Sequence, residues 1–172
     1  MKAKTTVLVY ACDFSQGGAW LGDETIRRLE GLKTLHNTDQ TVLILSAGFS
    51  PRSFKYPNQT ESFAKMMKSW VLENTNIPKQ NIYADTEDCV WGTVAETNKA
   101  IQLIKKHDLP KYVIFITSKY HKNRVAFIWR LLASSDWNVS GISVDYPPPV
   151  WFIEKAKTFW ALLKILKIWV MK

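Results

Sequence analysis

Residues 112–124 read Tyr-Val-Ile-Phe-Ile-Thr-Ser-Lys-Tyr-His-Lys-Asn-Arg, and this segment carries the clearest sign of the chain's architecture. The run 112–116 is short and apolar, which is typical of a strand that is buried on both faces, as in parallel sheets. Apolar residues then recur at helical spacing, at Val125, Ile128, Trp129 and Leu132. A buried strand that leads directly into a helix is the repeating unit of an α/β fold.

Four polar residues lie where this strand gives way to the helix: Thr117, Ser118, His121 and Arg124. His121 and Arg124 are three positions apart and so share one face of the helix. Open α/β sheets bind ligands at this edge, where helix amino ends favour anions. Taken singly, each residue has an ordinary alternative, such as a helix cap or a surface ion pair. Together, the four residues predict a site.

Strand-like and helix-like segments alternate along the rest of the chain. The pattern predicts a single α/β domain over residues 1–172, a Rossmann-like three-layer sandwich with a mostly parallel sheet of about five strands. We expect Asp23 and Thr60 to cap two of its helices, and Thr93 with Glu96 to form a capping box for a third. The predicted strands span residues 6–11, 41–45, 81–83, 112–116 and 139–144.

The composition is that of a globular protein, with 47% hydrophobic and 22% charged residues in 172. Cys12 and Cys89 are too few for a disulfide framework or a cysteine-based zinc site, and reduced thiols in a cytosolic protein are the simplest account. The first apolar run, residues 6–12, is too short for a signal peptide or a membrane span. We therefore expect a cytoplasmic protein.

The net charge of +8 favours anionic partners. The lysines are scattered and form no nucleic-acid motif, so we expect a small anionic ligand rather than nucleic acid. The last segment, residues 151–171, combines Trp, Phe, Ile and Leu with lysines and is predicted to be an amphipathic helix. The favoured interpretation is a last helix that packs on the sheet. The alternative is a basic helix that makes peripheral contact with an anionic membrane.

The order of these elements resembles the YdcF/SanA/ElyC-like family, a bacterial domain of unknown function. The resemblance covers almost the whole chain, and its most specific element is Thr117-Ser118-x-x-His121-x-x-Arg124. Two departures concern the loops after the first two strands: Tyr10-Ala11-Cys12-Asp13 stands where the family has glycines, and Ala47 replaces a turn glycine. The further positions that match the family are Arg28, Ser46, Gly48, Glu61, Thr93 and, at the last helix, Glu154, with its acidic position at either Asp85 or Glu87.

The matched residues are expected to lie in one crevice at the strand ends and to have different roles there. Arg28 and Arg124 are suited to hold a phosphate or carboxylate. His121 is suited to proton transfer near neutral pH, and Asp13 and Glu61 complete the catalytic candidates. Their spacing is not that of metal ligands, so no metal site is predicted. The residues expected to contact the ligand or cofactor, besides the two arginines, are Ser46, Gly48, Thr93, Thr117 and Ser118.

Two functions follow from the sequence. The first is a small-ligand-binding α/β protein, an enzyme acting on a nucleotide-like or phosphorylated anionic compound. The resemblance to YdcF makes S-adenosylmethionine a candidate cofactor, although the loop after the first strand lacks the closely spaced glycines of ordinary methyltransferases. The second is a non-catalytic, envelope-associated binding protein acting at the membrane surface, as the resemblance to SanA and ElyC implies.

Overall fold

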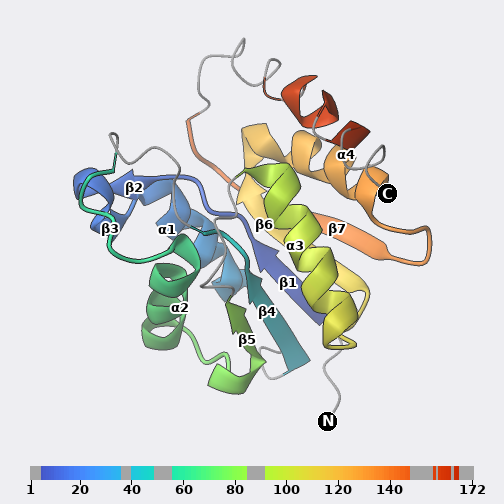
Figure 1. The fold of residues 1–172 in the computed structure, drawn as a ribbon. Helices are drawn as coiled ribbons and strands as arrows, with labels where there is room; N and C mark the ends of the chain where they lie inside the picture. The colour runs from blue at the N-terminus through green and yellow to red at the C-terminus, as the bar shows by residue number, and fades with distance from the viewer. Residues whose placement is uncertain are drawn as a thin grey trace.

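Five parallel strands form one sheet in the order β5-β4-β1-β6-β7 (Figure 1). The computed structural model describes residues 5–35, 40–48, 56–84, 92–147, 157, 159–163, 165 and 166. The predicted α/β class and the five-stranded sheet are confirmed. The strands are β1 (Thr5–Val9), β4 (Thr41–Leu45), β5 (Ile82–Ala84), β6 (Tyr112–Ser118) and β7 (Asn138–Val144).

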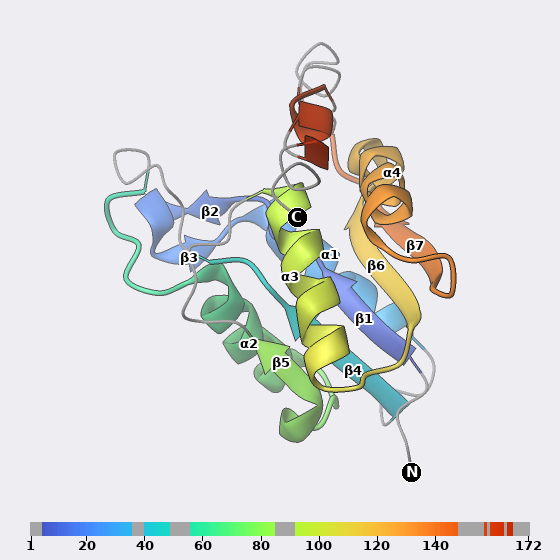
Figure 2. The same ribbon diagram turned by 45° about the vertical axis from the view of Figure 1, so that its right-hand side comes forward.

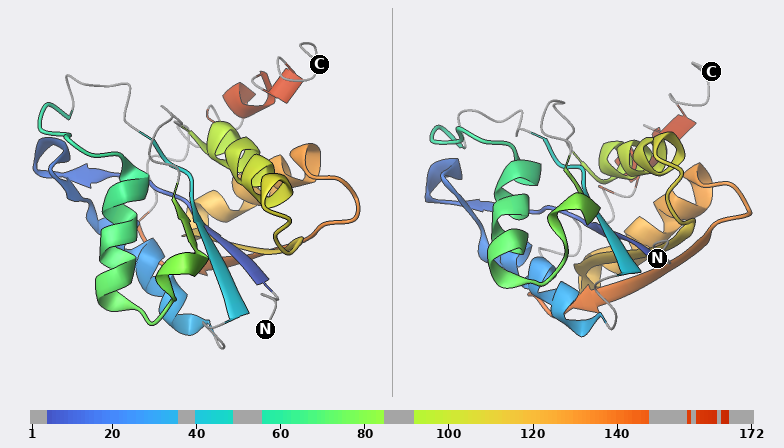
Figure 3. Two further views of the ribbon diagram at one scale, coloured as in Figure 1. Left: turned by 60° about the horizontal axis from the view of Figure 1, so that its bottom comes forward. Right: turned by 90° about the horizontal axis from the view of Figure 1, so that it is seen from below.

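Helices cover both faces of this sheet, as Figures 2 and 3 show. Along β1, Val7 and Val9 point into the core beneath α1 and α2, whereas Leu8 and Tyr10 point into the core beneath α3 and α4. The central strands are therefore apolar on both faces, which explains why they read as continuous hydrophobic runs. The helices are α1 (Asp23–Glu30), α2 (Phe63–Asn74), α3 (Thr93–Lys106) and α4 (Lys122–Leu132).

The strand order fixes where a ligand is expected. From β1 the chain passes to β4 on one side, and after β5 it crosses over to β6 on the other side of β1. The order is that of a Rossmann-like sheet, which has its switch point between its first and fourth strands. The carboxyl ends of β1 and β6 therefore border the crevice in which such sheets bind ligands.

Three predicted helix caps are wrong. Helix α2 is capped by Ser62, whose Oγ accepts from the Lys65 amide at 3.2 Å, and not by Thr60. Helix α3 has Gly92 at its N-cap, with φ of 95°, so Thr93 is its first residue and the capping box with Glu96 does not form. Helix α1 begins at Asp23 after an N-cap at Gly22. At both α1 and α3, the side chains or amides that the predicted caps would have used are hydrogen-bonded to residues distant in sequence.

A short antiparallel pair, β2 (Phe14–Ser15) and β3 (Trp20–Leu21), lies in the loop after β1 and was not predicted. Its anchor is Phe14, whose ring stacks on Phe63 of α2 with centroids 3.5 Å apart. The hairpin therefore extends the apolar core over the amino end of α2, and it fixes the start of the loop that leads into α1.

The described part of the terminal segment is helical, at residues 157, 159–163, 165 and 166. Ala161 and Ile165 are buried with Val94 of α3 and Ile128 of α4. This segment thus packs on the two helices, whereas the sequence favoured packing on the sheet. In the part of the chain that the structure describes, none of the helices has the length and apolar character needed to cross a membrane.

Candidate functional site

A cavity of about 630 Å³ opens at the carboxyl ends of β1 and β6, at the switch point of the sheet. Its wall combines the loop after β1, the first turns of α1 and α3, the segment after β6, and the terminal helix. The charged or titratable residues that line it come from all of these elements. They are Cys12, Asp13, Glu24, Arg28, Tyr56, Glu96, Tyr120, His121, Arg124 and Lys157.

Arg28 is buried, and each nitrogen of its guanidinium group has a partner within the protein. Its Nε donates to Ser118 Oγ at 3.0 Å, and one terminal nitrogen donates to the carbonyl oxygens of Tyr10 and Ala11, each at 3.0 Å. The other terminal nitrogen pairs with Glu24 at 2.5 Å, one helical turn away. Arg28 therefore ties α1 to the ends of β1 and β6, and its charge is matched inside the protein.

Glu24 is the acidic centre of this network, and the sequence analysis did not single it out. Its Oε1 also accepts from the hydroxyls of Ser118 at 2.5 Å and Tyr120 at 2.6 Å. Burial alone would raise the pKa of the Glu24 carboxyl, but the Arg28 charge and the two hydroxyls outweigh it and hold the pKa below its ordinary value. The four-residue spacing to Arg28 is the sequence signal that could have revealed Glu24.

His121 is buried between two threonine hydroxyls. Its Nδ1 lies 2.8 Å from Thr117 Oγ1, and its Nε2 lies 3.1 Å from Thr93 Oγ1. Burial, reinforced by the positive charges of Arg124, Arg28 and Lys157, lowers the pKa of His121 well below its ordinary value. The ring is therefore neutral at pH 7, with one nitrogen donating and the other accepting. It joins the start of α3 to the end of β6.

This depressed pKa predicts that His121 destabilises the protein in acid. Below a pH of about 6.5 the unfolded histidine binds a proton while the folded one does not, so stability falls as the pH falls. Relative to His121→Gln, we expect the wild type to lose about 1 kcal/mol between pH 6.5 and 5.5. Urea unfolding at both pH values measures this difference. His107→Gln, at an exposed position, is the control, and an equal pH response in all three proteins would contradict the assignment.

Glu96 carries the most unusual environment in the cavity wall. The residue is 5% exposed, and its Oε2 has no hydrogen-bond partner among the residues that the structure describes. Burial raises the pKa of Glu96 to about 7, although Arg28, the amides of Ala11 and Gly92, and Arg124 act in the opposite direction. The sequence pattern predicts only a helix-capping role for Glu96, because burial next to a cavity leaves no trace in a short motif.

Asp13 lines the cavity, but its carboxylate accepts hydrogen bonds at the start of α1. Its Oδ1 accepts from the amide and the hydroxyl of Thr25, each at 3.1 Å. Asp13 thus caps α1 from the preceding loop and occupies the role that we expected of Asp23. A Cβ atom on Gly22 would lie 2.3 Å from the Asp13 carboxyl carbon, so this cap also requires glycine at that position.

Five predicted site residues do not line the cavity, and three of them, Ser46, Gly48 and Glu61, also make contacts of other kinds. Ser46 is buried, and its hydroxyl donates to the Glu96 carbonyl at 3.1 Å, while the carbonyl of Gly48 accepts from the Phe63 amide at 3.2 Å. Both residues fasten the end of β4 to neighbouring helices. Glu61 precedes α2, outside its first turn, and forms a partly exposed ion pair with Lys65 at 2.5 Å. None of the three is positioned to contact a ligand in this cavity.

Comparisons of the chain with protein-family models, with curated proteins and with solved structures find no match. Five of the predicted residues lie together in the cavity wall, with Thr117 and Ser118 bonded directly behind them: Asp13, Arg28, Thr93, His121 and Arg124. Asp85, Glu87 and Glu154 lie outside the described residues.

Proposed function

We propose that the protein binds a small anionic compound, nucleotide-like or phosphorylated, in this cavity and that Glu96 exchanges a proton with it. One observation carries the proposal: a buried carboxyl with a pKa of about 7 and a polar oxygen without a described partner lines a cavity large enough for a small molecule. General acid–base catalysis is most effective when the pKa lies near the working pH. Perturbed carboxyls in clefts are also typical of functional sites.

The charges around Glu96 support an anionic ligand. Arg124 and Lys157 bring positive charge to the cavity from α4 and from the terminal helix. The Arg28 charge is balanced by Glu24, and the Asp13 carboxylate is engaged at the start of α1. A cavity of about 630 Å³ lies in the range of small-molecule sites, which is about 300–1,000 Å³. The resemblance to the YdcF-like family adds S-adenosylmethionine to the candidates, as a nucleotide-like compound whose one anionic group is its carboxylate.

His121 has a positioning role in this proposal. Because it is neutral and its two nitrogens face hydroxyls, it is poorly placed to take up a proton. It holds Thr93, the first residue of α3, and thereby sets the position of Glu96 one turn later. Glu96 replaces His121 as the candidate acid or base.

Thermal unfolding with a ligand panel tests the binding proposal. The panel contains S-adenosylmethionine, nucleoside mono- and diphosphates, and sugar phosphates. A ligand at about one hundred times its dissociation constant adds about 2.7 kcal/mol, or a shift of roughly 5–10 °C for a domain of this size. We expect Arg124→Met to abolish the shift and Arg130→Met, at an exposed position of the same helix, to retain it. Equal shifts in both variants, or none in the wild type, would contradict the proposal.

The Glu96 assignment has its own test in the absence of ligand. Between a pH of about 4.5 and 7 the folded protein keeps a proton that the unfolded chain has released, so its stability falls as the pH rises across this range and levels off above it. A rise from 4.5 to about 7, at about 1.36 kcal/mol per pKa unit, corresponds to about 3 kcal/mol. Glu96→Gln is therefore expected to be about 2–3 kcal/mol more stable, relative to the wild type, at pH 8 than at pH 5.

The measurement is urea unfolding of both proteins across this pH range. Glu61→Gln, which changes a partly exposed carboxylate, is the matched control. If Glu96→Gln behaves like Glu61→Gln, the carboxyl is charged in the folded protein at neutral pH, and the proposed proton exchange is wrong.

A second candidate function is the non-catalytic, envelope-associated role implied by the resemblance to SanA and ElyC. The exposed apolar side chains of the terminal helix favour it, since they offer a contact surface next to the cavity. This role predicts binding to membranes and no shift in thermal unfolding with any ligand of the panel. The first candidate predicts a ligand-dependent shift.

A further inference from the structure

The terminal helix exposes a dense group of large apolar side chains. Among the described residues eight large hydrophobic side chains are exposed, and five of them belong to this helix. We refer to these five as the apolar face. They are Phe159 (61% exposed), Trp160 (63%), Leu162 (36%), Leu163 (42%) and Leu166 (54%). Single exposed apolar residues are ordinary, but a contiguous group of them marks an interaction surface.

The apolar face lies opposite the side by which the helix is attached to the protein. Ala161 and Ile165 are one turn apart, and both are buried against α3 and α4. With about 100° between successive helical residues, Phe159, Leu163 and Leu166 point away from that buried side. The helix thus carries apolar side chains both on the side that faces the domain and on the side that faces its surroundings. Packing within the domain explains only the first of these two sides.

The charges of this segment indicate which surface the apolar face meets. After Glu154 the sequence contains five lysines and no acidic residue, and the chain as a whole carries a net charge of +8. Lys157 is exposed on the described part of the helix. Apolar side chains mixed with Trp and Lys match the interface of a bilayer with negatively charged headgroups, where tryptophan rings and lysine stems are well accommodated.

We propose that the apolar face is a docking surface for an anionic lipid bilayer. On docking, Phe159, Leu163 and Leu166 enter the boundary between headgroups and acyl chains, and the positive charge of the segment attracts the anionic headgroups. Trp160 lines the cavity as well as belonging to the apolar face, so the docked protein holds its cavity next to the membrane surface. The attachment is peripheral, through the terminal helix alone.

Vesicle co-sedimentation tests this proposal with the full chain. The probes are vesicles of phosphatidylcholine alone and vesicles that contain about 30% phosphatidylserine. We expect binding to the anionic vesicles at low salt, at least about tenfold weaker binding to the neutral ones, and loss of binding as salt rises. Tryptophan fluorescence is expected to shift to the blue on binding, because Trp160 leaves water.

The variant Phe159→Ser/Leu163→Ser removes two apolar side chains that do not line the cavity. We expect it to bind anionic vesicles at least about tenfold more weakly than the wild type. The matched control is Trp20→Ser/Leu72→Ser, which removes two exposed apolar side chains elsewhere on the domain. Circular dichroism and thermal unfolding verify that both variants fold.

Three outcomes would overturn the proposal. The first is no sedimentation with anionic vesicles at low salt, and the second is equal binding to neutral and anionic vesicles. The third is a concentration-dependent dimer of the wild type that Phe159→Ser/Leu163→Ser dissociates, since the apolar face would then join two copies of the chain. None of these outcomes affects the ligand shift expected for the cavity, so the two proposals fail separately.

Discussion

Replacing Arg28 by methionine is expected to lower the free energy of unfolding by about 3–5 kcal/mol at pH 7, since removing one partner leaves a buried charge uncompensated. Glu24 would then hold its charge without a cationic partner in this network, with the Ser118 and Tyr120 hydroxyls as donors. The carbonyls of Tyr10 and Ala11 would also lose a donor. Denaturant unfolding measures the difference, because methionine keeps most of the side-chain volume and isolates the loss of the charged group.

Arg27 provides the matched control, since it is adjacent on the same helix but exposed. Arg27→Met is expected to change stability by less than about 0.5 kcal/mol, as for ordinary surface substitutions. Arg28→Met with similarly small effects would mean that the guanidinium is not the centre of the network and is available to a ligand, as the sequence first suggested.

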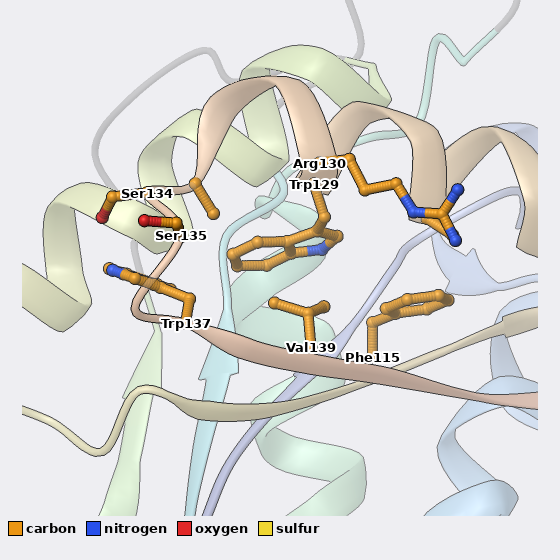
Figure 4. Close-up of a pocket in the computed structure, with 9 residues that line it drawn as sticks. Phe115, Trp129, Arg130, Ser134, Ser135, Trp137 and Val139 are labelled. Carbon is orange, nitrogen blue, oxygen red and sulfur yellow. The ribbon is translucent and has the colours of Figure 1, made fainter.

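Replacing Trp129 by alanine is expected to lower the free energy of unfolding by about 3–5 kcal/mol, the range for large aromatic truncations in cores. Figure 4 shows its indole ring above Val139 and Phe115, between α4 and β7. The ring is buried and lies 6.0 Å from that of Trp137. A second cavity, of about 360 Å³, already adjoins these rings, so the truncation would enlarge an existing void.

Thermal unfolding measures this loss as a fall in Tm of roughly 6–20 °C, at about 2–4 °C per kcal/mol for a domain of this size. Trp20→Ala is the control, because Trp20 is the same residue type at an exposed position of β3. A fall in Tm for Trp129→Ala no larger than that for Trp20→Ala would contradict the packing of α4 on β6 and β7.

The fold was predictable because its central strands are buried on both faces. Residues 41–45 and 112–116 are continuous apolar runs, and both fall in parallel strands, the first with unchanged bounds. The helix starts were less predictable, since a cap depends on what else its side chain meets. Thr93 was expected to cap α3 but bonds to His121, a contact across 28 positions of sequence.

The location of the site was also predictable, but the partners within it were not. Parallel strands bring their carboxyl ends and the residues after them to one edge, which is why His121 and Arg124 line the cavity and Thr117 and Ser118 are bonded directly behind it. Distances of a few ångströms decide which charges in the cavity wall are paired within the protein. The i, i+4 spacing of Glu24 and Arg28 allows an ion pair but does not show that it is buried, and the pKa near 7 that burial gives Glu96 has no signature in spacing.

The pairing of β1 with β6 also determines how the nascent chain is exposed on the ribosome. Thr6 pairs with Val113, so one edge of β1 has no partner until more than one hundred further residues have been made. At a synthesis rate of about 5–20 residues per second, that edge stays open for roughly 5–20 s. Open strand edges recruit other chains. Translation speed between the two strands therefore sets how long each newly made molecule is vulnerable to aggregation.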